Sequence, residues 1–149
     1  MKIEKKIIII NGPNLNLLGK REPEFYGKTT LKDIEELSNN KANELGVVLK
    51  FVQSNDESKI IDWIQGSRNQ DGLIINAGAY THTSIAIQDA LRLLECPAIE
   101  VHISNIFKRE DYRHLSYIAP VVAGSIVGLG AHGYVLAIEA ISKLIKLEK

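Results

Sequence analysis

The hydrophobic positions of the chain fall into two alternating patterns. Short apolar runs rich in isoleucine and valine predict strands, and longer segments with apolar residues at helical spacing predict helices. Strands are predicted at residues 6–11, 47–53, 73–76, 98–104 and 122–127. Helices are predicted at residues 30–46, from residue 54 onward, between residues 83 and 97, and after residue 133. Because no internal repeat or linker interrupts this alternation, we expect a single domain over residues 1–149.

Local signals set the expected helix boundaries. Thr30 with Asp33 predicts a capping box for the first helix, and Gly46 predicts its end. Ser54 with Glu57 predicts a second capping box. The apolar stripe of the first helix is expected to comprise Leu31, Ile34, Leu37 and Leu45.

Strands that alternate with helices form a parallel sheet covered on both faces. We therefore expect an α/β protein with a flavodoxin-like, doubly wound, three-layer α/β/α fold. Its five strands are expected in the order 2-1-3-4-5. In this fold class, ligands bind at the carboxyl ends of the strands.

Composition narrows the range of partners. Eighteen Lys and Arg residues balance eighteen Asp and Glu residues, which gives no reason to expect a nucleic-acid or membrane-surface partner. Cys96 is the only cysteine, so the sequence predicts no disulfide framework, no cysteine-based metal site and a cytoplasmic location. Residues 115–138 lack charged side chains, but Pro120 and four glycines there argue against a membrane helix. We expect a buried strand, a glycine turn and a helix instead.

Polar side chains gather where the predicted strands end. A long polar loop follows the first strand, a second polar loop follows the third, and the fourth strand alternates so that Glu100 and His102 share a face. Because carboxyl ends of parallel strands meet at one sheet edge, these residues should line one small-molecule site. This set suits proton transfer on a polyhydroxylated carboxylate. The residues are Asn14, Arg21, Tyr26, Asn76, His82, Glu100, His102 and Ser104.

Other chemistries fit the sequence less well. Residues 128–133 spell G-x-G-x-x-G, but this dinucleotide fingerprint belongs to a first βαβ unit with an acidic residue further on. A tight turn that brings the backbone close to a neighbour is the better interpretation. The four histidines have no metal-site spacing and no cysteine partner, so no metal is expected. Arg21 beside Tyr26 could stabilise a phenolate base, although on this pair alone an ordinary surface loop is the favoured interpretation.

Four separated motifs resemble those of the type II 3-dehydroquinate dehydratases. They are NGPNLNLLGKREPEFYG, INAGAYTHTSIAIQDAL, EVHISNIFKREDYRHLS and GSIVGLGAHGY, in family order and spacing over nearly the whole chain. The resemblance implies a lyase of the shikimate pathway of aromatic amino acid biosynthesis. Such an enzyme eliminates water from 3-dehydroquinate in the anti sense through an enolate. It needs no cofactor.

The resemblance implies a role for each catalytic residue. Tyr26 would remove a proton from C2 of the substrate, and Arg21 would lower the pKa of that tyrosine. Asn14 would hold a water that stabilises the enolate. His102 would protonate the departing C1 hydroxyl, and Glu100 would position that histidine.

The same resemblance implies the substrate contacts and the assembly. Asn76 and the backbone of Ile103 and Ser104 would hold the carboxylate, while His82 and Arg113 would bind ring hydroxyls. Asp89 would reach into the site of a neighbouring subunit within a homododecamer of four trimers. The alternative from another class is a non-catalytic flavodoxin-like module that binds a nucleotide or a protein.

Overall fold

The computed structural model describes residues 4–20, 24 and 27–147. Within this part of the chain, five strands form one parallel sheet in the order β2-β1-β3-β4-β5, so the predicted fold class and strand order are confirmed. The strands are β1 (Lys5–Asn11), β2 (Val47–Gln53), β3 (Gly72–Asn76), β4 (Ala98–His102) and β5 (Gly124–Val127). The helices are α2 (Leu31–Leu45), α3 (Glu57–Gln65), α4 (Ile85–Arg92) and α5 (His132–Leu147). Short 3₁₀ turns are η1 (Leu15–Leu17), η2 (Ser67–Asn69), η3 (Gly78–His82), η4 (Ile106–Lys108), η5 (Asp111–Arg113) and η6 (Ala119–Val121).

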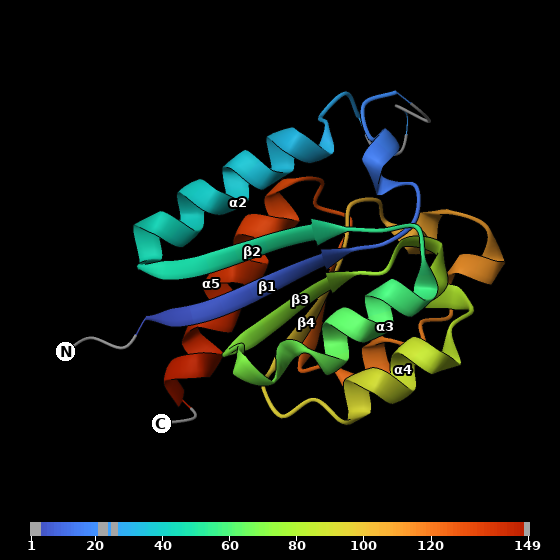
Figure 1. The fold of residues 1–149 in the computed structure, drawn as a ribbon. Coiled ribbons are helices and arrows are strands. Elements are labelled where there is room, and N and C mark those ends of the chain that lie inside the picture. Colours follow the sequence, from blue (N-terminus) through green and yellow to red (C-terminus); the bar gives the residue numbers. More distant parts are fainter. Residues whose placement is uncertain (1–3, 21–23, 25–26, 148–149) are drawn as a thin grey trace.

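Two helix layers cover the sheet. Helices α2 and α5 lie on one face, and α3 and α4 lie on the other (Figure 1). Successive side chains of a strand point to opposite faces. Ile7 and Ile9 of β1 therefore join the core under α2 and α5, whereas Ile8 and Ile10 join the core under α3 and α4. This double burial explains why β1 is a run of isoleucines rather than an alternating pattern.

The boundaries of α2 are as predicted, but its buried face is not. Thr30 and Asp33 form the reciprocal capping box, and Gly46 in the left-handed region ends the helix. The buried positions are Ile34, Ser38 and Ala42, which follow one another at four-residue spacing. The predicted apolar stripe was wrong at Leu37 and Leu45. Leu37 lies to one side of the line of buried residues, and Leu45 is the last residue of the helix. Both Leu37 and Leu45 are exposed.

Helix α3 begins with a different cap from the one predicted. Asp56, not Ser54, is the N-cap, and its Oδ1 accepts a hydrogen bond from the Ser58 N–H at 2.9 Å. The Ser54 hydroxyl instead accepts from the Asp56 N–H at 2.9 Å, so it stabilises the turn before the helix. A carboxylate at the N-cap accepts hydrogen bonds from the free N–H groups of the first turn, and its negative charge interacts favourably with the helix dipole. Both effects favour a helix that starts after Asp56 rather than after Ser54.

Helix α4 ends well before Pro97, where the sequence predicted its end. Ser84 caps its start, but the last turn tightens to 3₁₀ hydrogen bonds, from Leu93 to Ala90 at 3.2 Å and from Leu94 to Leu91 at 3.1 Å. The chain then leaves the helix through an exposed Leu93.

The last strand is shorter and more exposed than predicted. Strand β5 pairs only with β4, at the edge of the sheet, and Gly124 and Ser125 are exposed. The expectation of a buried strand was therefore wrong, because helices cover an edge strand less fully. The glycine turn that follows behaves as predicted. A Cβ on Gly128 (φ +87°) would lie 2.8 Å from the Cβ of Asn105.

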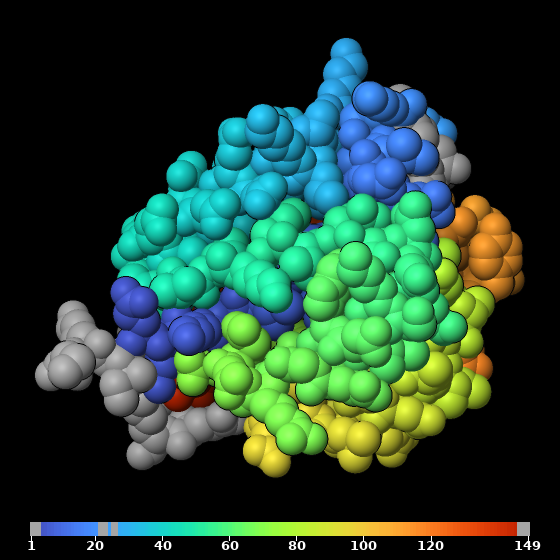
Figure 2. Space-filling view, in the orientation of Figure 1, coloured from blue at the N-terminus to red at the C-terminus, as the bar shows by residue number. Residues whose placement is uncertain are grey.

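The space-filling view shows the segment after β4, orange in the figure, projecting at the end where the strands finish (Figure 2). This is the sheet edge at which sequence reasoning placed the site. No helix within the described ranges is both long and apolar enough to cross a lipid bilayer.

Candidate active site

A cavity of ≈ 170 Å³ lies at the carboxyl ends of β1, β3 and β4. It brings together seven residues predicted from the sequence, namely Asn14, Asn76, His82, His102, Ile103, Ser104 and Arg113. Glu100 lies behind His102, and Asp89 is exposed on α4 and does not line this cavity. Arg21 and Tyr26 lie outside the described residues. A larger cleft of ≈ 650 Å³ lies between the carboxyl ends of α3 and α4, at the opposite end of the strands, but no described site residue lines it.

The loops after β1 and β3 form the floor of the cavity. The Gly12 N–H donates to the Asn76 carbonyl at 2.8 Å, and a Cβ on Gly12 would lie 2.3 Å from the Ala77 carbonyl oxygen. Two residues later, Asn14 adopts the left-handed conformation (φ 68°), which asparagine tolerates better than most residues. Its N–H donates to the Asn55 side chain at 2.9 Å. Backbone packing thus fixes where Asn14 enters the site.

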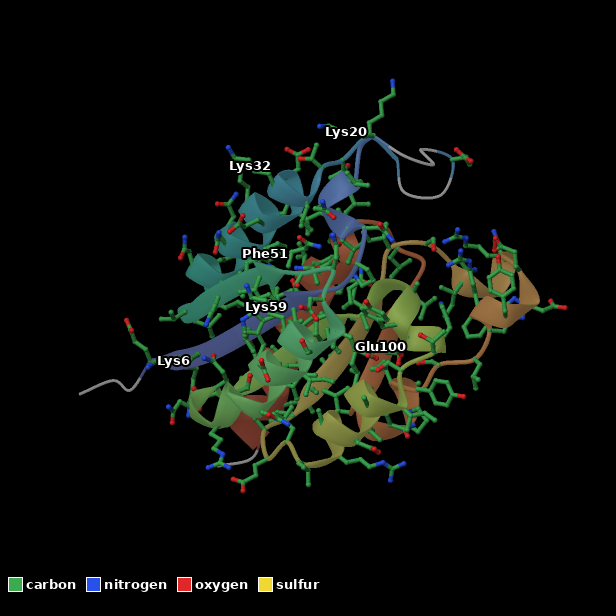
Figure 3. The ribbon with its side chains drawn as sticks, turned by 45° about the vertical axis from the view of Figure 1, so that its right-hand side comes forward. Lys6, Lys20, Lys32, Phe51, Lys59 and Glu100 are labelled. Atoms are coloured by element: carbon green, nitrogen blue, oxygen red, sulfur yellow. The ribbon has the colours of Figure 1, made fainter. Side chains whose placement is uncertain are left out.

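Glu100 is the acceptor for three side chains. Its Oε2 accepts from His102 Nε2 at 2.8 Å and from the Ser116 hydroxyl at 2.7 Å, and its Oε1 accepts from the Ser125 hydroxyl at 2.6 Å. The Glu100 side chain is only 2% exposed, and Figure 3 labels it near the middle of the view, away from the outline of the chain. Burial acts to raise the pKa of Glu100, but the hydrogen bonds and the charge of His102 outweigh it, so the pKa is lowered.

This carboxylate determines which nitrogen of His102 faces the cavity. Because ionised Glu100 can only accept, His102 Nε2 must carry a proton. The other nitrogen, Nδ1, is then the one that can exchange a proton with a ligand. The shared strand face predicted for Glu100 and His102 is confirmed by their hydrogen bond.

His82 has the complementary arrangement. Its Nδ1 lies 2.7 Å from the Leu115 carbonyl, so Nδ1 carries the proton and Nε2 is an acceptor in the neutral ring. Burial is the main cause that lowers the pKa of His82, and it outweighs the Leu115 hydrogen bond, which acts to raise it. The His82 and His102 rings stack with centroids 6.3 Å apart. One side of the cavity therefore presents two imidazoles with different hydrogen-bonding roles.

Two arginines lie on the segment that follows β4. Arg113 Nε pairs with Glu110 at 2.9 Å, and Arg109 Nη1 donates to the Ser104 hydroxyl at 3.4 Å. Arg113 was predicted, whereas Arg109 was missed although it also lines the cavity. Its signal in the sequence was a basic residue in the polar segment directly after a site strand. Sequence reasoning also missed the two serines that contact Glu100, because both come from distant segments.

The cavity is lined by two arginines, two asparagine amides and two imidazoles that can each gain or lose a proton. Among the described residues, no three His, Cys, Asp or Glu side chains cluster as metal ligands. Guanidinium and amide groups bind carboxylates and hydroxyls, and a buried Glu–His pair performs acid–base catalysis. Fold and site together define an α/β protein whose cavity suits proton transfer on a small polar anion.

Comparison with known proteins identifies the family. The model of the family described as "Dehydroquinase class II" matches residues 5–142. The chain is 55% identical over 136 residues to the "3-dehydroquinate dehydratase" of Dinoroseobacter shibae, with 91% of each chain covered. It is 54% identical over 149 residues to the "Catabolic 3-dehydroquinase" of Emericella nidulans, with 99% of this chain and 97% of that one covered.

A solved structure supports the same assignment. The type II dehydroquinase from Propionibacterium acnes superposes with a TM-score of 0.91 at 41% identity, covering 96% of this chain and 99% of that one. The chain therefore belongs to the class II dehydroquinase family, and the resemblance noted in its motifs is confirmed.

Proposed function

We propose that this protein is a 3-dehydroquinate dehydratase, a hydro-lyase that converts 3-dehydroquinate to 3-dehydroshikimate and water in the shikimate pathway. Family membership supports the reaction. The observation that carries the proposal is the buried Glu100–His102 pair beside a cavity lined by amides and arginines. The enzyme uses no cofactor in this proposal, because the substrate's own carbonyl accepts the electrons.

The proposed elimination begins at C2. Tyr26 removes the C2 proton as a phenolate, and the electron pair moves to the C3 carbonyl to give an enolate. Arg21 stabilises the phenolate, because a guanidinium stays charged and, at ~4 Å in an effective dielectric of ~20, would attract it by ~4 kcal/mol, which lowers the pKa of the tyrosine. Asn14 holds a water that donates to the enolate oxygen. The position of Asn14 in the cavity lining supports its assignment as the residue that holds this water.

The enolate then expels the C1 hydroxyl. As the C1–O bond breaks, His102 Nδ1 gives its proton to the leaving oxygen, which departs as water. The negative charge of Glu100 stabilises the protonated ring before this step and keeps the Nε2 proton directed away from the substrate. The base and the acid act on opposite faces of the substrate ring, which gives anti elimination.

The remaining cavity residues bind the substrate. Asn76 and the backbone of Ile103 and Ser104 hold the carboxylate, and His82 and Arg113 bind ring hydroxyls. The neutral His82 suits this role because its Nε2 can accept from a hydroxyl.

We further propose that the site is completed by assembly. Asp89 is exposed on α4 and lies off its own cavity, which supports a contact with the site of an adjacent subunit. The proposed assembly is a homododecamer of four trimers in the cytoplasm, with no nucleic-acid or membrane partner.

A direct assay tests the proposed function. Adding 3-dehydroquinate to the purified protein should produce the growing ultraviolet absorbance of the enone product. His102→Ala should abolish this signal, while His132→Ala should retain it, because His132 is exposed and does not line the cavity. No turnover by the wild-type protein, or copurification of a bound nucleotide or flavin without turnover, would instead favour a non-catalytic flavodoxin-like module that binds a nucleotide or a protein.

A further inference from the structure

A buried row of hydrogen bonds runs behind the cavity between two backbone groups. The Asn11 Nδ2 donates to the Val52 carbonyl at 2.9 Å, the Tyr134 hydroxyl donates to Asn11 Oδ1 at 2.7 Å, and Asn76 Nδ2 donates to the Tyr134 hydroxyl at 2.9 Å. The Gly78 N–H donates to Asn76 Oδ1 at 3.2 Å and ends the row. All three side chains are buried.

The two backbone groups fix the direction of every bond between them. The Val52 carbonyl can only accept, so the atom of Asn11 that faces it must be the amide nitrogen. Asn11 then presents its oxygen to Tyr134, so the phenol must donate to it. The phenol oxygen is left to accept from Asn76. At the other end, the Gly78 N–H can only donate, and its 3.2 Å contact with Asn76 Oδ1 agrees with the orientation that the shorter Tyr134 hydrogen bond imposes.

This fixed direction leaves Asn76 with one free donor. An asparagine amide has two N–H bonds, and Tyr134 takes one of them. The second remains for a ligand, and Asn76 lines the cavity. Burial raises the pKa of Tyr134 far above its ordinary value, although the Asn76 hydrogen bond opposes this, so the phenol stays protonated at neutral pH. The row therefore keeps one orientation across the working pH range.

We infer that Tyr134 is a positioning residue that orients the Asn76 amide so that its second N–H is presented to the substrate carboxylate. This inference rests on the proposed function, in which Asn76 binds that carboxylate. Tyr134 belongs to α5 and does not line the cavity, so it acts through Asn76. The carboxylate does not change during the reaction, and its contacts contribute equally to ground-state and transition-state binding.

The first test is Tyr134→Phe, which removes the hydroxyl and keeps the ring. The KM for 3-dehydroquinate should rise about tenfold while kcat stays within about threefold, because loss of uniform binding changes KM alone. Inhibition by substrate analogues should distinguish a role of Tyr134 in carboxylate binding from a general structural role. Quinate should bind about tenfold more weakly to the variant, whereas quinamide, which lacks the charge, should lose less than about threefold. Equal losses for both ligands would overturn the inference.

Ser142→Ala is the matched control. Ser142 lies on the same helix, is similarly buried, and donates to the Ile138 carbonyl at 2.8 Å. Its loss removes a buried hydroxyl from α5 without touching the row. KM and the preference for quinate over quinamide should both stay at wild-type values.

A double-mutant cycle tests whether Tyr134 acts through Asn76. Adding Tyr134→Phe to Asn76→Ala should raise KM no further, because no amide remains to be oriented. Additive losses would show an independent structural effect and overturn the inference. If Tyr134→Phe does not fold, Asn11→Ala replaces it, because without Asn11 Oδ1 the phenol proton is free to turn and the phenol oxygen is no longer a fixed acceptor for the Asn76 N–H. That variant should weaken quinate more than quinamide.

The two levels of the proposal fail differently. Absence of wild-type turnover would overturn the proposed function. Normal wild-type turnover with an unchanged KM in folded Tyr134→Phe would overturn only the role of Tyr134.

Discussion

His102 Nε2 lies 2.8 Å from Glu100 Oε2, two residues back along the same face of β4. Because the pKa of Glu100 is lowered, its carboxylate is ionised and can only accept, so the imidazole proton on Nε2 is fixed. The pair thus places a defined histidine nitrogen at the cavity and a negative charge behind it.

Glu100→Gln should lower kcat by about 10²-fold with little change in KM, because the amide keeps an acceptor for His102 but loses the charge that stabilises its protonated form. The amide nitrogen is expected to face Ser125, whose hydroxyl can rotate to accept it. Steady-state kinetics are the measurement, with Ser125→Ala as the control that keeps the charge. An equal loss of kcat in Ser125→Ala would contradict the electrostatic role.

Acid should reduce the stability advantage of the wild-type protein over Glu100→Gln. The folded-state pKa of Glu100 is lowered from 4.5, so its ionised form stabilises the folded state above that pH. This contribution is lost as pH falls through the lowered folded pKa. Urea unfolding of both proteins between pH 7 and pH ~3 should show the difference narrowing on the acid side. A constant difference would mean that Glu100 does not titrate in this range.

Protonation of His82 should weaken substrate binding only in acid. Its pKa is lowered from 6.5, mainly by burial, so the neutral acceptor persists through pH 6.5 and is lost below the lowered value. The KM of the wild-type protein should stay flat from pH 8 to about 6.5 and then rise. His82→Asn should have a raised KM at pH 7 and lack this acid dependence. A wild-type rise in KM that begins above pH ~7 would contradict the assigned role.

Tyr26→Phe should reduce turnover by at least ~10² to 10⁴, because it removes the proposed base and keeps the ring. Arg21→Ala should move the rising limb of kcat/KM to higher pH, since the phenolate loses its stabilising charge. Arg21→Lys should recover part of the shift, because it keeps the charge without the rigid fork. The measurement is kcat/KM against pH. Near-wild-type activity in Tyr26→Phe would assign the base to another group.

Subunit mixing should restore activity between two inactive variants if Asp89 serves a neighbouring site. Asp89→Ala and Tyr26→Phe proteins are mixed under conditions that exchange subunits, and enone formation is followed. Some hybrid sites then combine an intact Tyr26 with an intact Asp89, so part of the activity should return. Mass spectrometry of hybrid assemblies verifies exchange. Verified exchange without recovery would place the action of Asp89 within its own chain.

The sequence predicted the sheet more reliably than the helix surfaces. Short runs of β-branched residues such as Ile7 to Ile10 favour strands buried on both faces, and the strand order followed from the fold class that the alternation of strands and helices predicted. The buried face of α2 was harder to predict because small residues, Ser38 and Ala42, pack where leucine was expected. The cap of α3 was misplaced because Ser54 and Asp56 compete for the same turn.

The site was predictable where its residues end neighbouring strands. Asn76, His82 and His102 were placed correctly because parallel strands finish at one edge. The contacts behind the cavity were not, because Tyr134 meets Asn76 across 58 residues of sequence and each residue alone looks like ordinary core or loop. Only the folded chain joins them.

The backbones of Gly12 and Ala77 lie so close together that a methyl group on Gly12 would clash with Ala77. This contact joins the two loops of the cavity floor through their backbones, so a larger side chain at Gly12 would push these loops apart. Variation is possible on the projecting segment after β4, where Phe107 and Tyr112 are exposed. A designer who wants this scaffold to accept a different acid should diversify that segment and leave the paired loops untouched.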